Sequence, residues 1–307
     1  MQNKVLILDG RNLLWRTSDS FAMLYTEVEG KEIGVGGIYG FLSVGLRLHN
    51  RYGGKVIVAW EGVNNFRYNI YPQYKKKETK VEEDITRIEF KKDLMKQEIR
   101  LKAILRAMGV DQYEGDGCEA DDVLATLANK YASDGIPAII YTNDSDLRQS
   151  VRFGIRVVAP GMRGKDMVYN NALEVFKKDG VAPVQVPDLK ALAGDTSDNI
   201  PGVMGVGPET AKKLLGRFNT VEDIITGTQE AADEDWPVGV RFRKIIWEAR
   251  HDLRKYKKLT VVLINANMSK IEANKNQSRV VNYLKLYKFR SLCSHAELNG
   301  LMNMGEF

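Results

Sequence analysis

The sequence is poor in the side chains that bind soft metals or form nucleophilic triads. It has two cysteines, Cys118 and Cys293, and three histidines in 307 residues. Two cysteines at that spacing form neither a disulfide framework nor a zinc site. Three scattered histidines argue against a histidine-rich metal centre and against a Ser/His/Asp triad. A catalytic metal in this chain is therefore expected to have oxygen ligands.

Long apolar runs and a recognisable leader are also missing. The longest apolar runs, at 138–141 and 259–264, are far too short to span a bilayer. The N-terminal Met-Gln-Asn-Lys enters a strand-like run at once, without the profile of a signal peptide. We expect a cytoplasmic protein that has no membrane partner.

Basic and acidic residues are distributed differently along the chain. Lysine and arginine total 45 against 40 acids, which gives a net charge of +5. The basic residues gather at 75–77, 91–106 and 241–258, whereas the acids gather in short motifs. A basic surface around an acidic pit is the charge layout expected of a metal-dependent enzyme that acts on a polyanion.

Short apolar runs alternate with helical spacing in the first part of the chain. The runs at 5–8, 55–60 and 138–141 predict buried strands, and residues 36–50 and 120–132 have helical spacing. This alternation predicts an α/β fold with a mainly parallel sheet flanked by helices.

The pattern changes near residue 180. Helical segments separated by Gly/Pro turns follow from 183 to 248, which predicts a smaller helical domain. We expect an α/β domain over 1–180, a helical domain over 181–260, and an extension over 261–307 whose packing the pattern does not specify.

Acidic residues recur where strands end or helices begin. Asp9, Glu61 and Asp144 fall at or just after predicted strands, at the edge where open parallel sheets bind ligands. One acid at such a place has an ordinary explanation, because Asp and Glu cap helices and close turns. A cap needs only one side chain, however, and Glu-Ala-Asp-Asp at 119–122 has three acids. The candidate metal ligands are Asp9, Glu61, Glu119, Asp121, Asp122, Asp144, Asp146, Asp195 and Asp198.

Such a cluster is suited to metal-assisted hydrolysis. Crowded carboxylates repel one another unless cations neutralise them. Ligands that are all oxygen favour Mg²⁺, with Mn²⁺ as a substitute. Two or more such ions can activate a water, clamp a phosphate and stabilise the leaving oxygen. The cluster therefore predicts a phosphodiesterase.

Six motifs in order give the chain a family resemblance over roughly residues 4–260. They are Leu8–Leu13, Gly36–Leu42, Arg67 with Tyr71–Lys75, Glu119–Asp122, Thr142–Asp146 and Gly194–Gly207. In these motifs the sequence resembles the 5′-nuclease superfamily, which includes the 5′→3′ exonuclease domain of bacterial DNA polymerase I, phage 5′-exonucleases and flap endonucleases. The resemblance implies a PIN-like sheet domain, a helical arch at about 66–108 and a helix-hairpin-helix (H3TH) domain.

The resemblance also implies roles for basic and aromatic residues. Lys75 resembles the arch lysine that family members place on the scissile phosphate, and Arg67 resembles a second phosphate contact; a solvated basic loop is the alternative for both. Tyr71 and Tyr74 are expected to stack on an unpaired terminal base, with packing inside the arch as their alternative. The implied DNA-binding set is Tyr71, Tyr74, Lys76, Lys77, Gly202, Gly205, Gly207, Lys212 and Lys213.

The glycine-rich turn has a physical reading of its own. Gly205 and Gly207 leave exposed backbone just before a helix that starts near Pro208. Backbone N–H groups and the helix dipole then face a phosphate. In relatives this turn also holds a monovalent cation, which implies K⁺ at this place; an ordinary corner between two helices is the alternative.

Glu61 departs from the family pattern, which usually has Asp at that position. Glutamate is one methylene longer, so the metal or a bridging water is expected to shift. Because no polymerase sequence follows, we expect a free-standing, monomeric nuclease of a bacterial or phage-infected cell.

The residues and the resemblance together predict a Mg²⁺-dependent 5′→3′ exonuclease and flap endonuclease. Its substrate is expected to be DNA with a 5′ end, flap or branch, cut by a two-metal-ion mechanism in replication or repair. One alternative is a ribonuclease H-like enzyme that removes RNA primers from RNA–DNA hybrids. The other is a non-catalytic protein that binds branched DNA, but such a protein is expected to lack part of the carboxylate cluster.

Overall fold

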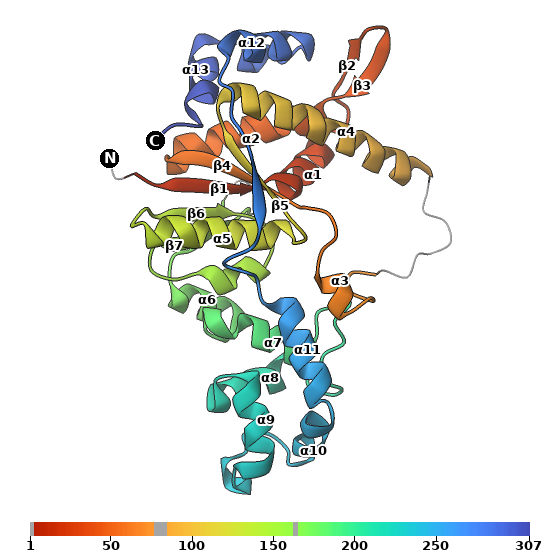
Figure 1. The fold of residues 1–307 in the computed structure, drawn as a ribbon, viewed down its shortest axis with the longest axis vertical. Coiled ribbons are helices and arrows are strands. Elements are labelled where there is room, and N and C mark those ends of the chain that lie inside the picture. The colour runs from red at the N-terminus through yellow and green to blue at the C-terminus, as the bar shows by residue number, and fades with distance from the viewer. Residues whose placement is uncertain (1–2, 77–84, 162–164) are drawn as a thin grey trace.

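A seven-stranded sheet forms the centre of the molecule (Figure 1). The computed structural model describes residues 3–76, 85–161 and 165–307. Five strands are parallel, and the two edge strands, β8 and β9, run antiparallel to their neighbours. The sheet order is β8 (Met167–Tyr169), β7 (Ile155–Ala159), β6 (Ala138–Tyr141), β1 (Val5–Asp9), β4 (Lys55–Trp60), β5 (Asp111–Gly115) and β9 (Met268–Ile271).

The central strands are apolar on both faces because helices cover both faces. In β1, Val5 and Ile7 enter one core and Leu6 and Leu8 enter the other. This double burial explains why the strand is a continuous apolar run instead of an alternating one. The predicted parallel sheet flanked by helices is confirmed.

The two faces carry different sets of helices (Figure 1). One face is covered by α1 (Gly10–Ser20), α2 (Gly36–Tyr52) and α4 (Ile85–Met108). A hairpin of β2 (Tyr25–Val28) and β3 (Lys31–Gly34) projects between α1 and α2 in the chain. The other face is covered by α5 (Ala120–Ser133), and the elements that follow it along the chain are the 3₁₀ helix η1 (Asp146–Ser150) and α6 (Ala172–Asp179).

A helical unit continues from the second face and forms the lower part of Figure 1. After the 3₁₀ helix η3 (Pro183–Gln185), it contains α7 (Val186–Ala193), α8 (Pro208–Phe218), α9 (Val221–Glu230), α10 (Arg241–Glu248) and α11 (Arg250–Thr260), with the 3₁₀ helix η4 (Asp233–Asp235) between α9 and α10. Its apolar side chains, among them Leu192, Leu214 and Leu253, join the core of the second face. The glycine turn that precedes α8 therefore rests on a packed helical scaffold.

Residues 261–307 return to the sheet domain (Figure 1). Strand β9 pairs antiparallel with β5, and α12 (Gln277–Leu286), the 3₁₀ helix η5 (Arg290–Leu292) and α13 (His295–Asn303) pack over α4 and α2 and add to the core of the first face. A backbone hydrogen bond of 2.7 Å from Val56 N to Met304 O ties the end of the chain to β4. The chain thus leaves the sheet domain once and comes back.

The predicted arch at about 66–108 is described only in part. Helix α3 (Arg67–Ile70) and α4 belong to it, and residues 77–84, which include Lys77, lie outside the described residues. Among the described residues, no helix is both long enough and apolar enough to cross a membrane.

Candidate metal centre

A recess of about 400 Å³ opens at the carboxyl ends of the parallel strands. Asp9 ends β1, Glu61 directly follows β4, and Asp144 follows β6, so the sheet brings these three acids to one edge. Glu119 and Asp121 reach the same recess from the start of α5. Five of the nine predicted acids thus line one cavity, three from strand ends and two from the start of a helix.

Asp9 is one of the buried acids of this recess. Its carboxylate accepts from Asn12 N at 3.1 Å, which caps α1, and from Thr142 Oγ1 at 3.0 Å. Burial raises the pKa of Asp9 to about 6, and the charges of Asp144 and Glu61 add to that rise. Asp9 can therefore cap α1 and also serve as a metal ligand.

The pKa of Asp121 is raised for the same reasons as that of Asp9. Burial raises the pKa of its carboxyl well above its usual range, and the nearby charges of Asp144, Asp9 and Glu119 reinforce the effect. Four carboxylates in one buried place repel one another and favour either protons or added cations. The recess therefore has the electrostatics of a cation site.

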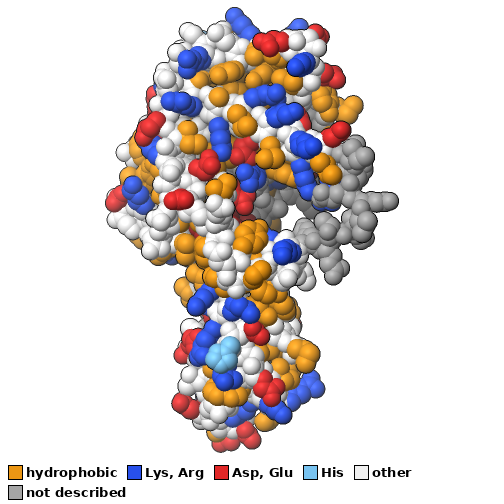
Figure 2. Space-filling model, turned by 45° about the vertical axis from the view of Figure 1, so that its right-hand side comes forward, with side chains coloured by type: hydrophobic (Ala, Val, Ile, Leu, Met, Phe, Trp, Pro, Cys, Tyr) orange, Lys and Arg blue, Asp and Glu red, His pale blue; other side chains and the backbone are white. Residues whose placement is uncertain are grey.

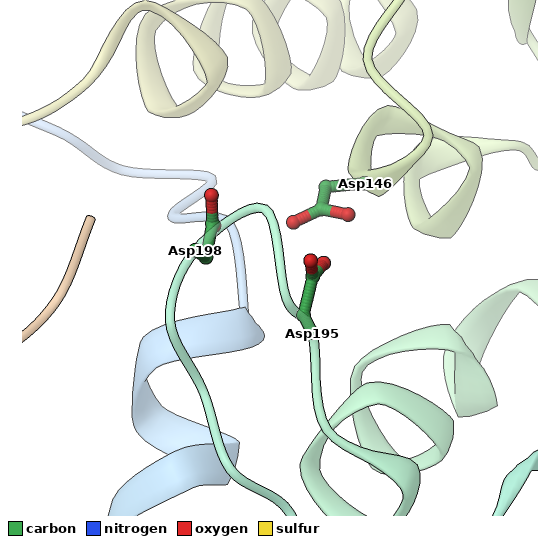
Figure 3. Close-up of side chains that lie close together, drawn as sticks. All are labelled: Asp146, Asp195 and Asp198. Atoms are coloured by element: carbon green, nitrogen blue, oxygen red, sulfur yellow. The ribbon is translucent and has the colours of Figure 1, made fainter. Parts of the chain in front are cut away.

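Three more acids form a second group, shown in Figure 3. Asp146 comes from η1, and Asp195 and Asp198 come from the loop between α7 and α8. One carboxylate oxygen of each lies within 4.8 Å of the others. This group joins the sheet domain to the helical unit.

Lys190 occupies the space between two of these acids, a contact that the sequence reasoning missed. Its Nζ donates to Asp195 Oδ2 at 2.7 Å and to Asp146 Oδ1. Burial alone would raise the pKa of Asp195, but hydrogen bonds from Lys190 and Ser197 outweigh it and lower that pKa. The sequence hint was the position of Lys190, on the helix that ends just before Asp195.

Lys75 connects the two groups of acids. Its Nζ lies 2.5 Å from Glu119 Oε1 and 3.9 Å from Asp198 Oδ1. Its backbone has φ +54 and donates to Asp198 O at 2.9 Å. Burial opposes the charge of Lys75, but Glu119 and Asp198 outweigh it and raise the pKa of the amine above its usual range. The ammonium group is therefore held charged at the recess.

Tyr74 differs from the prediction. The side chain is 1% exposed, so its ring cannot stack on a DNA base in this arrangement. Its hydroxyl oxygen lies 3.1 Å from Glu119 Oε2 and 2.9 Å from Asp198 Oδ2, so its single proton is shared between the two carboxylates. Tyr74 orients two carboxylates, and it is the packing alternative that holds for this residue.

Arg67 also differs from its predicted role as a phosphate contact. It is 1% exposed, and its guanidinium donates to both oxygens of Asp122, at 2.6 and 2.9 Å. Two further donors bond Leu259 O and Val261 O, each at 2.9 Å. Four of its five N–H donors are thus bonded, and Nη1 also lies 3.4 Å from Glu119 Oε2, so this buried guanidinium is committed to the protein and not to a phosphate.

Asp122 is correspondingly saturated. Besides Arg67, it accepts from Leu263 N at 2.8 Å and from Glu119 N at 3.1 Å, and it is fully buried. Both of its oxygens are occupied by protein donors, and it does not line the recess. The structure therefore makes Asp122 the counter-ion of Arg67 and corrects its prediction as a metal ligand.

Glu61 lines the recess but is paired with Arg11. The Arg11 guanidinium donates to Glu61 and, at 3.0 Å, to Glu98 of α4. The Glu61 side chain is 37% exposed, so it lies at the rim. Neither Arg11 nor Glu98 was singled out in the sequence, because charge partners so far apart in the chain leave no local pattern.

The predicted DNA-binding residues of the helical unit surround the turn before α8. Gly202 and Gly205 have φ +70 and +77, and Gly207 is the N-cap residue of α8. A side chain at Gly202 would collide with the backbone of Gly194, whereas Gly207 faces open space. Two predicted lysines follow this turn on α8. Lys212 pairs with Glu209 at 2.7 Å, and Lys213 is exposed.

Two other predicted contacts lie at the foot of the arch. Tyr71 is half-buried and packs edge-on against Tyr256, with ring centroids 6.1 Å apart. Lys76 is exposed. Lys76 follows Lys75 in the chain, and its side chain has no partner among the described residues.

Two family models match the chain in succession. The model described as "5′-3′ exonuclease, N-terminal resolvase-like domain" matches residues 4–181, and "5′-3′ exonuclease, C-terminal SAM fold" matches residues 181–283. The chain is 36% identical over 222 residues to a 5′-3′ exonuclease of Aquifex aeolicus, which covers 71% of each chain. It is 33% identical over 225 residues to the thermostable DNA polymerase I of Thermus aquaticus and spans 25% of that relative.

Solved structures show the same fold at low sequence identity. The chain superposes on the T5 D15 protein co-crystallised with metal ions with a TM-score of 0.68 and 17% identity, over 99% of this chain and 100% of the other. It superposes on flap endonuclease-1 from Methanococcus jannaschii with a TM-score of 0.57 and 14% identity, over 99% and 93% of the two chains.

Proposed function

This chain belongs to the 5′-3′ exonuclease family, and on that premise we propose that it hydrolyses DNA phosphodiesters at or near a 5′ end as an exonuclease and flap endonuclease. The observation that carries the proposal is the pair of carboxylate groups bridged by Lys75. One group belongs to the sheet edge and the other to the helical unit, so a substrate that contacts both must lie across the junction.

The donor set fits hard divalent cations, and we propose Mg²⁺, with Mn²⁺ as a substitute. Every candidate ligand is a carboxylate, and Asp146, Asp195 and Asp198 can converge on one ion. The raised pKa of Asp9 supports a cation requirement in the other group. Two bound ions would activate a water and neutralise the scissile phosphate.

The residues of the chain would position the substrate around this centre. Lys75, held charged beside Glu119, can move from the carboxylate to a phosphate oxygen. Tyr74 keeps Glu119 and Asp198 oriented while Lys75 moves. Lys190 can be displaced from Asp146 and Asp195 in the same way when a divalent ion enters.

The duplex part of the DNA would lie on the helical unit. The open turn at Gly205–Gly207 and the start of α8 present backbone N–H groups to a phosphate, and a K⁺ ion beside them is part of the proposal. Figure 2 shows lysine and arginine side chains on both the upper and the lower part of one face of the molecule. Related structures include one described as a pseudo-enzyme-product complex of the T5 D15 flap endonuclease with DNA and metal ions.

Cleavage of labelled 5′-flap and recessed 5′-end duplexes in Mg²⁺ tests the proposal. The wild type should cut both, Asp144→Asn should bind but cut more than about a hundredfold more slowly, and Lys75→Ala should lose rate on at least one substrate. Matched RNA–DNA hybrids measure the ribonuclease H-like alternative in the same assay. A wild type that binds these substrates and never cuts them contradicts the proposed activity, and a Lys75→Ala variant with full rates contradicts the role of that lysine.

A further inference from the structure

A second recess of about 470 Å³ adjoins the carboxylate recess. The two share Arg16 and Asn143 in their walls. Beyond these residues the second recess is lined by Arg47, Tyr141, Pro160, Gly161 and Asp166. A nucleic-acid strand that crosses the carboxylates of the first recess can therefore continue past Arg16 into this second recess.

The cavity carries an uncompensated positive charge. Arg47 is exposed, and neither it nor Arg16 has a carboxylate partner among the described residues. Asp166 is the one acid in the lining, and Arg51 at 3.0 Å and the Tyr52 hydroxyl at 2.8 Å already bond it. The net effect is an anion-attracting site whose own acid is neutralised.

Arg16 has spare hydrogen-bonding capacity at the boundary between the two recesses. Its Nη2 donates to the Tyr141 hydroxyl at 3.0 Å. Its Nη1 is buried and has no acceptor among the described residues. A buried donor without an acceptor is destabilising, and an oxyanion in the cavity can satisfy it after a small rotation of the side chain.

The two arginines of the second recess come from the face of the sheet opposite to the helical unit. They belong to α1 and α2, which cover one face of the sheet, and Tyr141 packs into the core of that face. The helical unit shares the core of the other face. A nucleic acid held at both places must therefore cross the carboxylates.

We propose that Arg16 and Arg47 form a subsite for a backbone phosphate of the DNA substrate, one that lies beyond the scissile bond on the side away from the helical unit. This inference rests on the proposed nuclease function and adds a second anchoring point to it. Arginine suits the role because its planar fork binds phosphate oxygens in pairs. The DNA would then be bound on both sides of the carboxylates, by the helical unit and by the arginine subsite. These two binding sites together would define the position of the cut.

Binding measurements with neutralised phosphates test the subsite. Methylphosphonates are placed singly along the cut strand, and separately along the other strands, of a flap substrate. Affinity is measured on Asp144→Asn proteins, so that no cutting occurs. The comparison uses Arg47→Ala and Arg47→Gln, with Arg279→Ala on the exposed surface of α12 as the matched control.

We expect one methylphosphonate position, or two adjacent ones, to weaken binding roughly tenfold when Arg47 is present and to have no effect when it is replaced. The strand that contains the position identifies which part of the substrate occupies the subsite. Both Arg47 variants should melt like Arg279→Ala. The subsite is wrong if they bind the natural substrate as the control does and keep its full methylphosphonate sensitivity. Failure of the proposed function looks different, because the wild type would then cut no flap substrate at all.

Discussion

Arg67 illustrates how one buried side chain serves stability instead of substrate binding. We expect Arg67→Met to lower the free energy of unfolding by about 3–5 kcal/mol, because it leaves the Asp122 carboxylate buried and unpaired. Urea denaturation measures the loss, and an added Asp122→Leu substitution should restore part of it. A variant of unchanged stability that binds DNA weakly would reinstate the phosphate contact expected from the sequence.

Glu61 and Asp144 should differ sharply in their effect on catalysis. Glu61 lies at the rim, is paired with Arg11 and raises the pKa of Asp9, whereas Asp144 raises the pKa of both Asp9 and Asp121. We expect Glu61→Gln to change kcat by less than about tenfold, and Asp144→Asn to lower it by more than about a hundredfold. Single-turnover cleavage at saturating Mg²⁺ makes the comparison; equal losses would place Glu61 among the metal ligands.

The positions of single residues explain what the sequence could predict at this scale. Asp9 and Asp144 were predictable because parallel strands deliver their carboxyl ends to one edge. The burial of Tyr74 was not, because an aromatic side chain in a basic loop has the same pattern whether it faces DNA or the interior. The contact of Lys190 with Asp146 was missed because the two residues lie 44 positions apart in the chain.

At the scale of elements, the C-terminal segment completes the sheet domain. Strand β9 covers the edge of β5, and α12 and α13 bury Val280, Leu284 and Leu301. A chain that ends at residue 266 would expose this core and leave an open strand edge. We expect it to aggregate or to unfold without a cooperative transition.

Thermal melting followed by circular dichroism, together with the soluble yield, compares the chain of residues 1–266 with the wild type. A chain shortened only by the exposed Phe307 is the control and should melt like the wild type. A soluble, cooperatively folding chain of residues 1–266 would show that the return segment is dispensable.

This segment was beyond the sequence reasoning for physical reasons. Met-Ser-Lys-Ile in β9 is too short for a clear alternation, and its partner β5 lies more than 150 residues earlier. By contrast, β1 and β4 were predictable because burial on both faces demands an unbroken apolar run. Long helices were also predictable, as the helical spacing at 36–50 and 120–132 shows for α2 and α5.

At the scale of the whole molecule, the crowded acids should make stability depend on pH and on metal. The folded-state pKa of Asp9 is about 6, above its ordinary value of 3.8. Between those values the folded protein binds more protons than the unfolded chain, so the contribution of Asp9 to stability is lost as the pH rises through 6. In chelator, Asp9→Asn should therefore gain stability relative to the wild type from pH 4 to pH 7, by up to about 3 kcal/mol.

Urea denaturation of both proteins at several pH values measures this difference. Asparagine can still cap α1, so the substitution leaves the local backbone supported. Added Mg²⁺ should raise the stability of the wild type at pH 7 and should raise that of Asp9→Asn much less. A difference between the two proteins that stays constant with pH would mean that Asp9 ionises normally.

The tie between Arg67, Asp122 and the carbonyls of Leu259 and Val261 fastens the start of α5 to the segment that leads back from the helical unit. Detaching the helical unit would break this tie and release the very helix that presents Glu119 and Asp121. Heat inactivation should therefore follow a single exponential decay, in step with the loss of folded protein. A sample partway through heating would contain folded, active molecules and unfolded, inactive ones. It would contain no molecules that still cleave DNA after their helical unit has detached.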